Sequence, residues 1–176
     1  VEKSVIGSVA ESLVLDSENL SAFSRLQEVF RSDSLQIASF TITEKGYQLC
    51  QPNGSYRKDV MADIISGPDH TISYMGKVVS LLHTRYLAGK KPIALVSMDN
   101  CSHNGSKLFD AVFTYASEWL KRGLVDSGFV TYIKNPDSVS FPWTMIDKIT
   151  PRPDSSIEAM LQTDGITDSH AIITGK

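Results

Sequence analysis

The segment SMDNCSHNG (residues 97–105) gathers small hydrogen-bonding side chains directly after a short apolar run. Asn100 carries a neutral amide, which can polarise a carbonyl or hold a developing alkoxide without titrating. Asp99 and Asn100 could equally form a turn or cap the next helix, since both residue types do so in many loops. Capping needs only one such residue, however, and Asn104 or Ser106 is better placed for it.

His103, in the same segment, also has two interpretations. It could act as a base or bind a metal, but Asp99 and His103 make a poor metal pair because no second His or Cys lies at a useful spacing. A histidine held in a loop by a hydrogen bond is the better interpretation. The sequence therefore predicts no metal site.

Two further polar clusters have the same ambiguity. In TEKGY (43–47), Glu44 and Lys45 could be an exposed ion pair on a turn, or part of a loop that meets a ribose or nicotinamide. In FPWTMIDKITPRP (141–153), Asp147 could belong to a surface ion pair, or the prolines could form a rigid path that directs it at a ligand. Pattern alone leaves both alternatives open.

The elements around these clusters predict an α/β fold with a mainly parallel sheet. Apolar spacing predicts strands and helices in alternation, and right-handed crossovers then make neighbouring strands parallel. In such sheets ligands bind beyond the carboxyl ends of the strands, where TEKGY and DNCSHNG both fall. The expected strands are 5–15, 35–42 and 93–98, and the last is expected to be covered on both faces. The expected helices are 20–30, 72–88, one from 104 or 106 to 119, 125–134 and 157–162. Asp16 or Ser17 is the expected cap of the first helix, and Asp69 or Thr71 that of the second.

Composition narrows the class of protein further. The chain has 176 residues and a formal charge of −3, and no basic block exceeds two residues, which argues against a nucleic-acid partner. We expect no membrane span, because no apolar stretch has the required length. The two cysteines, Cys50 and Cys101, suit a reducing compartment and hence the cytoplasm, with two free thiols favoured over a disulfide. No GxGxxG or phosphate-binding P-loop occurs.

Three segments together resemble a known family, the long-chain mannitol dehydrogenases. They are TITEKGY (41–47), SMDNCSHNG (97–105) and FPWTMIDKITP (141–151), and their order and separations also match, so the resemblance spans essentially the whole chain. The stretch between the second and third segments is similar to the fructuronate reductase (mannonate oxidoreductase) branch. Trp143 and Thr144 depart from the Asn-Ser or Asn-Thr that is commoner in the third motif.

The resemblance implies a zinc-independent oxidoreductase that passes hydride between NAD(H) and a ketose or keto-uronate, giving the polyol or aldonate. It implies that Asn100 holds the substrate oxygen, while a lysine base lies in a C-terminal domain outside this chain. Both roles are chemically coherent, because a neutral amide stabilises an oxyanion and a lysine can remove the alcohol proton. The remaining residues carried over are Glu44 and Asp147 at the cofactor, Thr43, Lys45 and Asp99 beside them, and His103 and Asn104 in support of the loop.

The resemblance also implies the domain organisation. Residues 1–176 correspond to part of a Rossmann-type NAD-binding domain, without the Gly-rich loop that precedes it and the helical substrate domain that follows it. We expect such a part to be inactive by itself. The alternative is a non-catalytic α/β module that binds a sugar or nucleotide. The sequence gives no indication of oligomeric state.

Overall fold

The computed structural model of the chain describes residues 7–15, 19–146 and 154–167. The chain divides into two compact units, Val1–Ile146 and Asp147–Lys176, and each is described by itself. Both candidate clusters that follow strands lie in the first unit, so its architecture positions them.

The described sheet has three parallel strands, β1 (Ile37–Phe40), β2 (Ile93–Ser97) and β3 (Val139–Ser140), in the order β1-β2-β3. Ile37 lies opposite Ala94 in the β1–β2 pair. Because all three strands run the same way, their carboxyl ends meet at one edge of the sheet. The expected α/β fold with a parallel sheet is confirmed.

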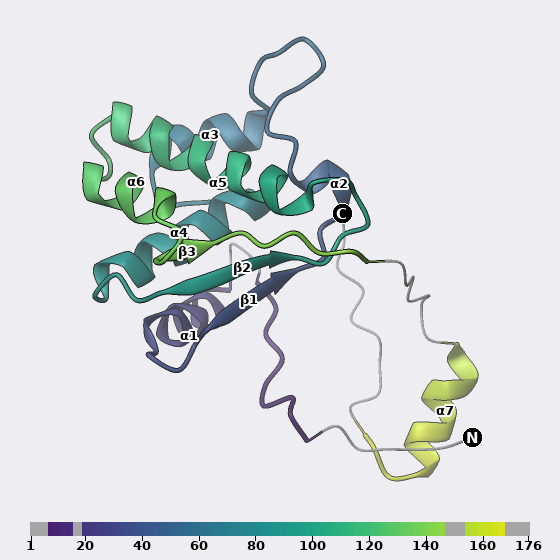
Figure 1. Cartoon of the computed structure of the whole chain (residues 1–176). Helices are drawn as coiled ribbons and strands as arrows, with labels where there is room; N and C mark the ends of the chain where they lie inside the picture. The colour runs from purple at the N-terminus through teal and green to yellow at the C-terminus, as the bar shows by residue number, and fades with distance from the viewer. Residues whose placement is uncertain (1–6, 16–18, 147–153, 168–176) are drawn as a thin grey trace. The chain divides into compact units, whose positions relative to one another are not determined.

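Helices fill the connections between the strands. Figure 1 shows α3, α4, α5 and α6 gathered on one side of the strands, and α1 packs along α4. The helices of the first unit are α1 (Leu20–Arg31), α2 (Thr43–Gly46), α3 (Lys58–Ser66), α4 (Tyr74–Leu87), α5 (Asn104–Lys121) and α6 (Ser127–Lys134), and the second unit contains α7 (Ser155–Thr163).

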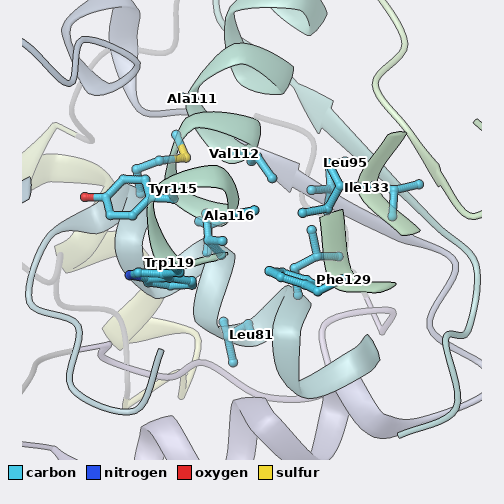
Figure 2. Packing of buried hydrophobic residues seen from close by; sticks show 14 of the residues in the cluster. Leu81, Leu95, Ala111, Val112, Tyr115, Ala116, Trp119, Phe129 and Ile133 are labelled. Atoms are coloured by element: carbon cyan, nitrogen blue, oxygen red, sulfur yellow. The ribbon is translucent and has the colours of Figure 1, made fainter. Parts of the chain in front are cut away.

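The apolar stripes of α4 and α5 form much of the core. Figure 2 shows α5 side chains in one cluster with Leu81 of α4, Leu95 of β2 and Phe129 of α6. Burying one large apolar side chain contributes about 1.5–3 kcal/mol to the free energy of folding. These buried side chains therefore hold α4 and α5 against the sheet. The buried stripe of α4 is Met75, Val78, Val79, Leu82 and Tyr86, and that of α5 is Leu108, Val112, Tyr115, Ala116 and Trp119.

The sheet is covered on one face only within the described residues. Ile93 and Leu95 of β2 are buried against the helices, whereas Ala94 and Val96, which point to the other face, are half-buried. Ile37, which pairs with Ala94, is 60% exposed. The expectation that this strand is covered on both faces is therefore wrong here.

A buried carboxylate fixes the start of α4. Asp63 of α3 is fully buried and accepts hydrogen bonds from the backbone N–H groups of Ile72 (2.7 Å) and Ser73 (3.0 Å). Ser73, and not the expected Asp69 or Thr71, is the N-cap, and its hydroxyl accepts from the N–H of Gly76. Because α4 runs back from the sheet's carboxyl edge, this capping holds the helix end near the site.

Other expectations fail at the start of the chain. Residues 7–15 of the expected strand 5–15 form no strand, so the alternating pattern there does not mark a sheet element. The cap of α1 is Asn19, whose side chain accepts from Ala22 N–H, while the expected caps at 16 and 17 lie outside the described residues. The sequence pattern also missed α3 entirely.

Candidate functional site

The carboxyl ends of β1 and β2 are joined by the side chain of Asp99. Its Oδ1 accepts a hydrogen bond from the N–H of Thr43 (2.8 Å), and its Oδ2 accepts from the N–H of Ile42 (3.0 Å) and from the hydroxyl of Tyr47. Asp99 is only 6% exposed. The first two sequence motifs, TEKGY and DNCSHNG, are therefore brought together at the expected edge.

Tyr47 connects this carboxylate to the strand behind it. Its hydroxyl lies 2.7 Å from Oγ of Ser97, the last residue of β2. Burial, followed by the hydrogen bond to Asp99, raises the pKa of Tyr47 well above its usual range. Burial and then the charge of Asp99 also raise the pKa of Tyr74, at the start of α4. Both phenols therefore stay protonated at neutral pH.

Asn100 differs from its neighbour because it points away from the protein. Its side chain is exposed and forms no hydrogen bond within the part of the chain that the structure describes. The amide is thus available to a ligand at the tip of β2. This placement meets the requirement that a ligand-binding amide is not already engaged in the fold.

His103 shapes the start of α5. It is the N-cap of the helix in a left-handed conformation (φ 54°), and its side chain forms no capping bond. The expected cap at Asn104 or Ser106 is therefore wrong, since Asn104 is the first helical residue. The His103 ring packs edge-on against Trp143, with ring centroids 4.5 Å apart.

Asn104 holds the third motif against the second. Its Nδ2 donates to the carbonyl (3.0 Å) and hydroxyl (2.8 Å) oxygens of Thr144, and its Oδ1 accepts from the N–H of Thr144 (3.1 Å). Nδ2 also donates to the carbonyl of Asp99 (3.1 Å). Segment 141–146 thereby runs along the start of α5. Asp147 follows this segment directly but lies outside the described residues.

Glu44 and Lys107 form an ion pair of 2.6 Å, and both residues line a groove of about 510 Å³. The pair is solvent-exposed, and the hydrogen bond to Glu44 raises the pKa of Lys107. Lys45 and Thr43, in the same short helix α2, are exposed as well. Asn100 does not line this groove, which is formed by Glu44, Tyr47, Gln48, Leu49, Cys50, Tyr56, Lys107, Asp110, Ala111 and Thr114.

Sequence reasoning missed the partners that complete the site. Lys107 and Thr144 received no role, although Thr144 sits inside a quoted motif. Ser97 and Tyr47 were also quoted without a role. Their partners are 40 to 63 residues distant in the sequence, which local spacing does not reveal.

Two observations concern metals and membranes. Among residues 7–15, 19–146 and 154–167, no three His, Cys, Asp or Glu side chains gather as a metal site. Within those ranges no helix is long and apolar enough to cross a bilayer. Cys50 is exposed, Cys101 is half-buried, and both are free thiols.

Residues 4–170 match the family described as Mannitol dehydrogenase Rossmann domain. This chain belongs to the mannitol dehydrogenase family. The match covers all three motifs, and the Rossmann-type fold class inferred from them is confirmed.

Individual relatives agree with the family. The chain is 44% identical over 175 residues to D-mannonate oxidoreductase of Thermotoga maritima, covering 99% of this chain and 32% of that protein. D-arabinitol 4-dehydrogenase of Klebsiella pneumoniae is 28% identical, with 80% of this chain and 29% of that protein covered. The higher identity to the mannonate enzyme agrees with the expected branch.

A solved structure shares the fold. The Pseudomonas fluorescens mannitol 2-dehydrogenase ternary complex with NAD and D-mannitol superimposes with a TM-score of 0.69 at 28% identity. The superposition covers 90% of this chain and 30% of that one. The chain thus spans about a third of the length of the relatives it matches.

Proposed function

We propose that this chain forms part of the nucleotide domain of an NAD-dependent oxidoreductase. The enzyme interconverts a ketose or keto-uronate, with a fructuronate-like sugar acid favoured, and the corresponding polyol or aldonate. The observation that carries the proposal is the Asp99 clamp, which brings two family motifs together and leaves the Asn100 amide free. Membership of the mannitol dehydrogenase family and 44% identity to a mannonate oxidoreductase support it.

Polar groups at the sheet edge suit a nicotinamide riboside and a sugar. Glu44 presents a carboxylate to solvent that can accept from ribose hydroxyls, with Thr43 and Lys45 exposed beside it. Asp147 belongs to the same proposed cofactor site. Asp99, His103 and Asn104 shape the loops, so we assign them support of this site.

Asn100 carries the chemistry that these residues contribute. A bound NAD(H) would supply the hydride chemistry of this interconversion, and Asn100 would lie with the substrate oxygen rather than with the cofactor. The Asn100 amide donates a hydrogen bond to the substrate oxygen, on which negative charge grows as its proton leaves. We assign the base that takes this proton to the part of the enzyme outside residues 1–176.

The proposed location of the enzyme is the cytoplasm. The two free thiols, Cys50 and Cys101, support this location, because thiols stay reduced in that compartment.

The decisive assay uses the complete enzyme with NADH and a panel of ketoses and keto-uronates. Oxidation of NADH by one class of substrate supports the oxidoreductase. Binding of NADH without turnover of any substrate would instead favour a non-catalytic binding module.

Replacing Asn100 by alanine tests its role within that assay. We expect Asn100→Ala to remove about 2–4 kcal/mol of transition-state stabilisation, which is about 30- to 1000-fold in kcat, with stability unchanged. Asn135→Ala is the matched control, because the side chain of that exposed asparagine accepts a single local hydrogen bond, from the N–H of Asp137. Equal turnover in both variants would remove Asn100 from the mechanism.

A further inference from the structure

The Asp99 carboxylate is fully occupied by the loop that carries Glu44. The three donors that it accepts, two consecutive backbone N–H groups and one phenol, lie 52 to 57 residues earlier in the chain. All three belong to segment 42–47. A side chain that is 6% exposed and holds three donors has little capacity left for a ligand.

That loop adopts a conformation that its own residues do not favour. Thr43 has a φ of 63°, which is unusual for a β-branched residue and costs about 1–2 kcal/mol. The helix it starts, α2, is a single turn whose N-cap Ile42 provides no side-chain bond. The hydrogen bonds that the N–H groups of Ile42 and Thr43 donate to the Asp99 carboxylate offset this cost, because hydrogen bonds to a carboxylate are the stronger kind.

The chemistry of the contact requires a carboxylate. An ionised aspartate only accepts hydrogen bonds, and here it meets three donors. An asparagine would turn one of its two ends into a donor, which would face a backbone N–H. Asp99 and Asn100 thus play different parts after the end of β2, since Asp99 is buried and bonded to segment 42–47 whereas Asn100 is exposed.

We propose that Asp99 is a positioning residue, which holds segment 42–47 so that Glu44 faces the cofactor site without itself touching cofactor or substrate. The inference rests on the proposed function for the role of Glu44. It refines the expectation that Asp99 lies beside Glu44 and Asp147 at the cofactor.

Amide hydrogen exchange tests the positioning step without any assay of activity. In the complete enzyme, we expect Asp99→Asn to speed exchange in a peptide covering 41–47 at least about tenfold, with α4 and α5 unchanged. Tyr47→Phe removes one donor and leaves both backbone bonds, so a smaller increase in the same peptide is expected. Tyr132→Phe is the matched control, because that buried phenol donates to the carbonyl of Lys91, just before the amino end of β2.

A double-mutant cycle with Glu44→Gln tests whether Asp99 acts through the loop. We expect Asp99→Asn alone to lower kcat/KM for NADH about 10- to 100-fold, and by less than about threefold when Glu44 is already Gln. The Tyr47→Phe variant should lower kcat/KM by a smaller factor, and this effect should also shrink when Glu44 is already Gln. A general loss of structure would lower kcat/KM equally in both backgrounds. If Asp99→Asn does not fold, Tyr47→Phe takes its place in the cycle.

The possible results separate the two proposals. Unchanged exchange in 41–47, or independent effects of Asp99→Asn and Glu44→Gln on kcat/KM, would overturn the positioning role. If none of the ketoses or keto-uronates tested makes the complete enzyme oxidise NADH, the proposed function fails. Faster exchange in 41–47 of Asp99→Asn would then still support the contact between Asp99 and the loop, but it would overturn the role of Asp99 in positioning a cofactor site.

Discussion

At the scale of single residues, Arg85 shows how the fold fixes the end of the sheet opposite the site. Its guanidinium is 1% exposed and donates five hydrogen bonds, all to backbone carbonyls. They come from the end of α1 and from the turns that lead into β1 and β2. The charge is therefore stabilised by carbonyl dipoles, including those at the negative end of a helix. These carbonyls belong to Phe30, Ser32, Leu35, Lys91 and Pro92.

Replacing Arg85 by lysine tests this arrangement. Lysine has three donors in place of a planar fork of five, so several buried carbonyls lose their partners. We expect Arg85→Lys to lower the free energy of unfolding by about 3 kcal/mol or more, measured by urea denaturation. The matched change Arg122→Lys, at an exposed ion pair with Glu118, should cost less than about 1 kcal/mol. Equal losses would mean that the carbonyl contacts contribute little.

The residue types of the site could be predicted from the sequence. Which of them faces a ligand and which holds a loop in place could not be predicted. A free amide after a buried strand was expected, and Asn100 is exposed as that role requires. Asn104 looked equally suited to capping, yet its amide holds Thr144, 40 residues later. Asp99 looked like a ligand-binding group, yet its oxygens hold Thr43. Such roles depend on partners distant in the sequence, which spacing does not encode.

At the scale of elements, periodicity worked where a helix buries one clear stripe. The helices that became α4 and α5 were predicted close to their observed ranges, because leucine, valine and aromatic residues recur there at helical spacing. α3 was missed because the buried face formed by Val60, Asp63 and Ile64 includes a charged residue that hides the pattern. Alternation in residues 7–15 suggested a strand, but a strand also requires a partner, which local pattern does not supply.

Gly105 permits the closest approach between two elements at the site. A Cβ on this residue would lie 2.4 Å from the carbonyl oxygen of Phe141 and 2.7 Å from that of Pro142. Backbone atoms do not move aside cheaply, so segment 141–146 could not stay against the start of α5. No other residue type fits this position without displacing the third motif.

We expect Gly105→Ala to lower the free energy of unfolding by about 1–3 kcal/mol and to speed amide exchange in 141–146. Gly7→Ala is the control, because a Cβ at Gly7 would meet nothing within 4 Å. An alanine variant at 105 that matches the Gly7 variant in both measurements would show that the contact can relax.

At the scale of the whole molecule, buried phenols link stability to pH. The pKa values of all six tyrosines are raised: the hydrogen bond to Asp126 raises that of Tyr86 to about 12, and burial raises that of Tyr132 to about 12. Burial raises the pKa of the others, which are Tyr47, Tyr56, Tyr74 and Tyr115. The folded state therefore holds phenol protons that the unfolded state releases near pH 10.

We expect the free energy of unfolding to fall in alkaline solution. Stability from the phenols is complete below pH 10 and is lost as the pH rises toward 12, by up to about 1.4 kcal/mol per pH unit for each buried tyrosine. Urea midpoints should stay level from pH 8 to about pH 9.5 and then fall between about pH 10 and 11, while phenolate absorbance should rise late and together with unfolding. Tyr132→Phe should make the fall shallower. Phenolate formation near pH 10 in the folded protein would contradict the assignment.

The hydrogen bonds that Asp99 accepts from segment 42–47, and those between Asn104 and Thr144, also bear on how the protein folds. These bonds join residues 40 to 57 positions apart. Those of Asp99 form only once β1 and β2 are paired, and those between Asn104 and Thr144 only once the segment after β3 has docked against α5. Contacts of such separation close late, because chain entropy must be lost before they stabilise anything. A partly folded chain would then offer no assembled crevice. Any ligand of that crevice would select the finished native state, and would slow its loss rather than hasten its formation.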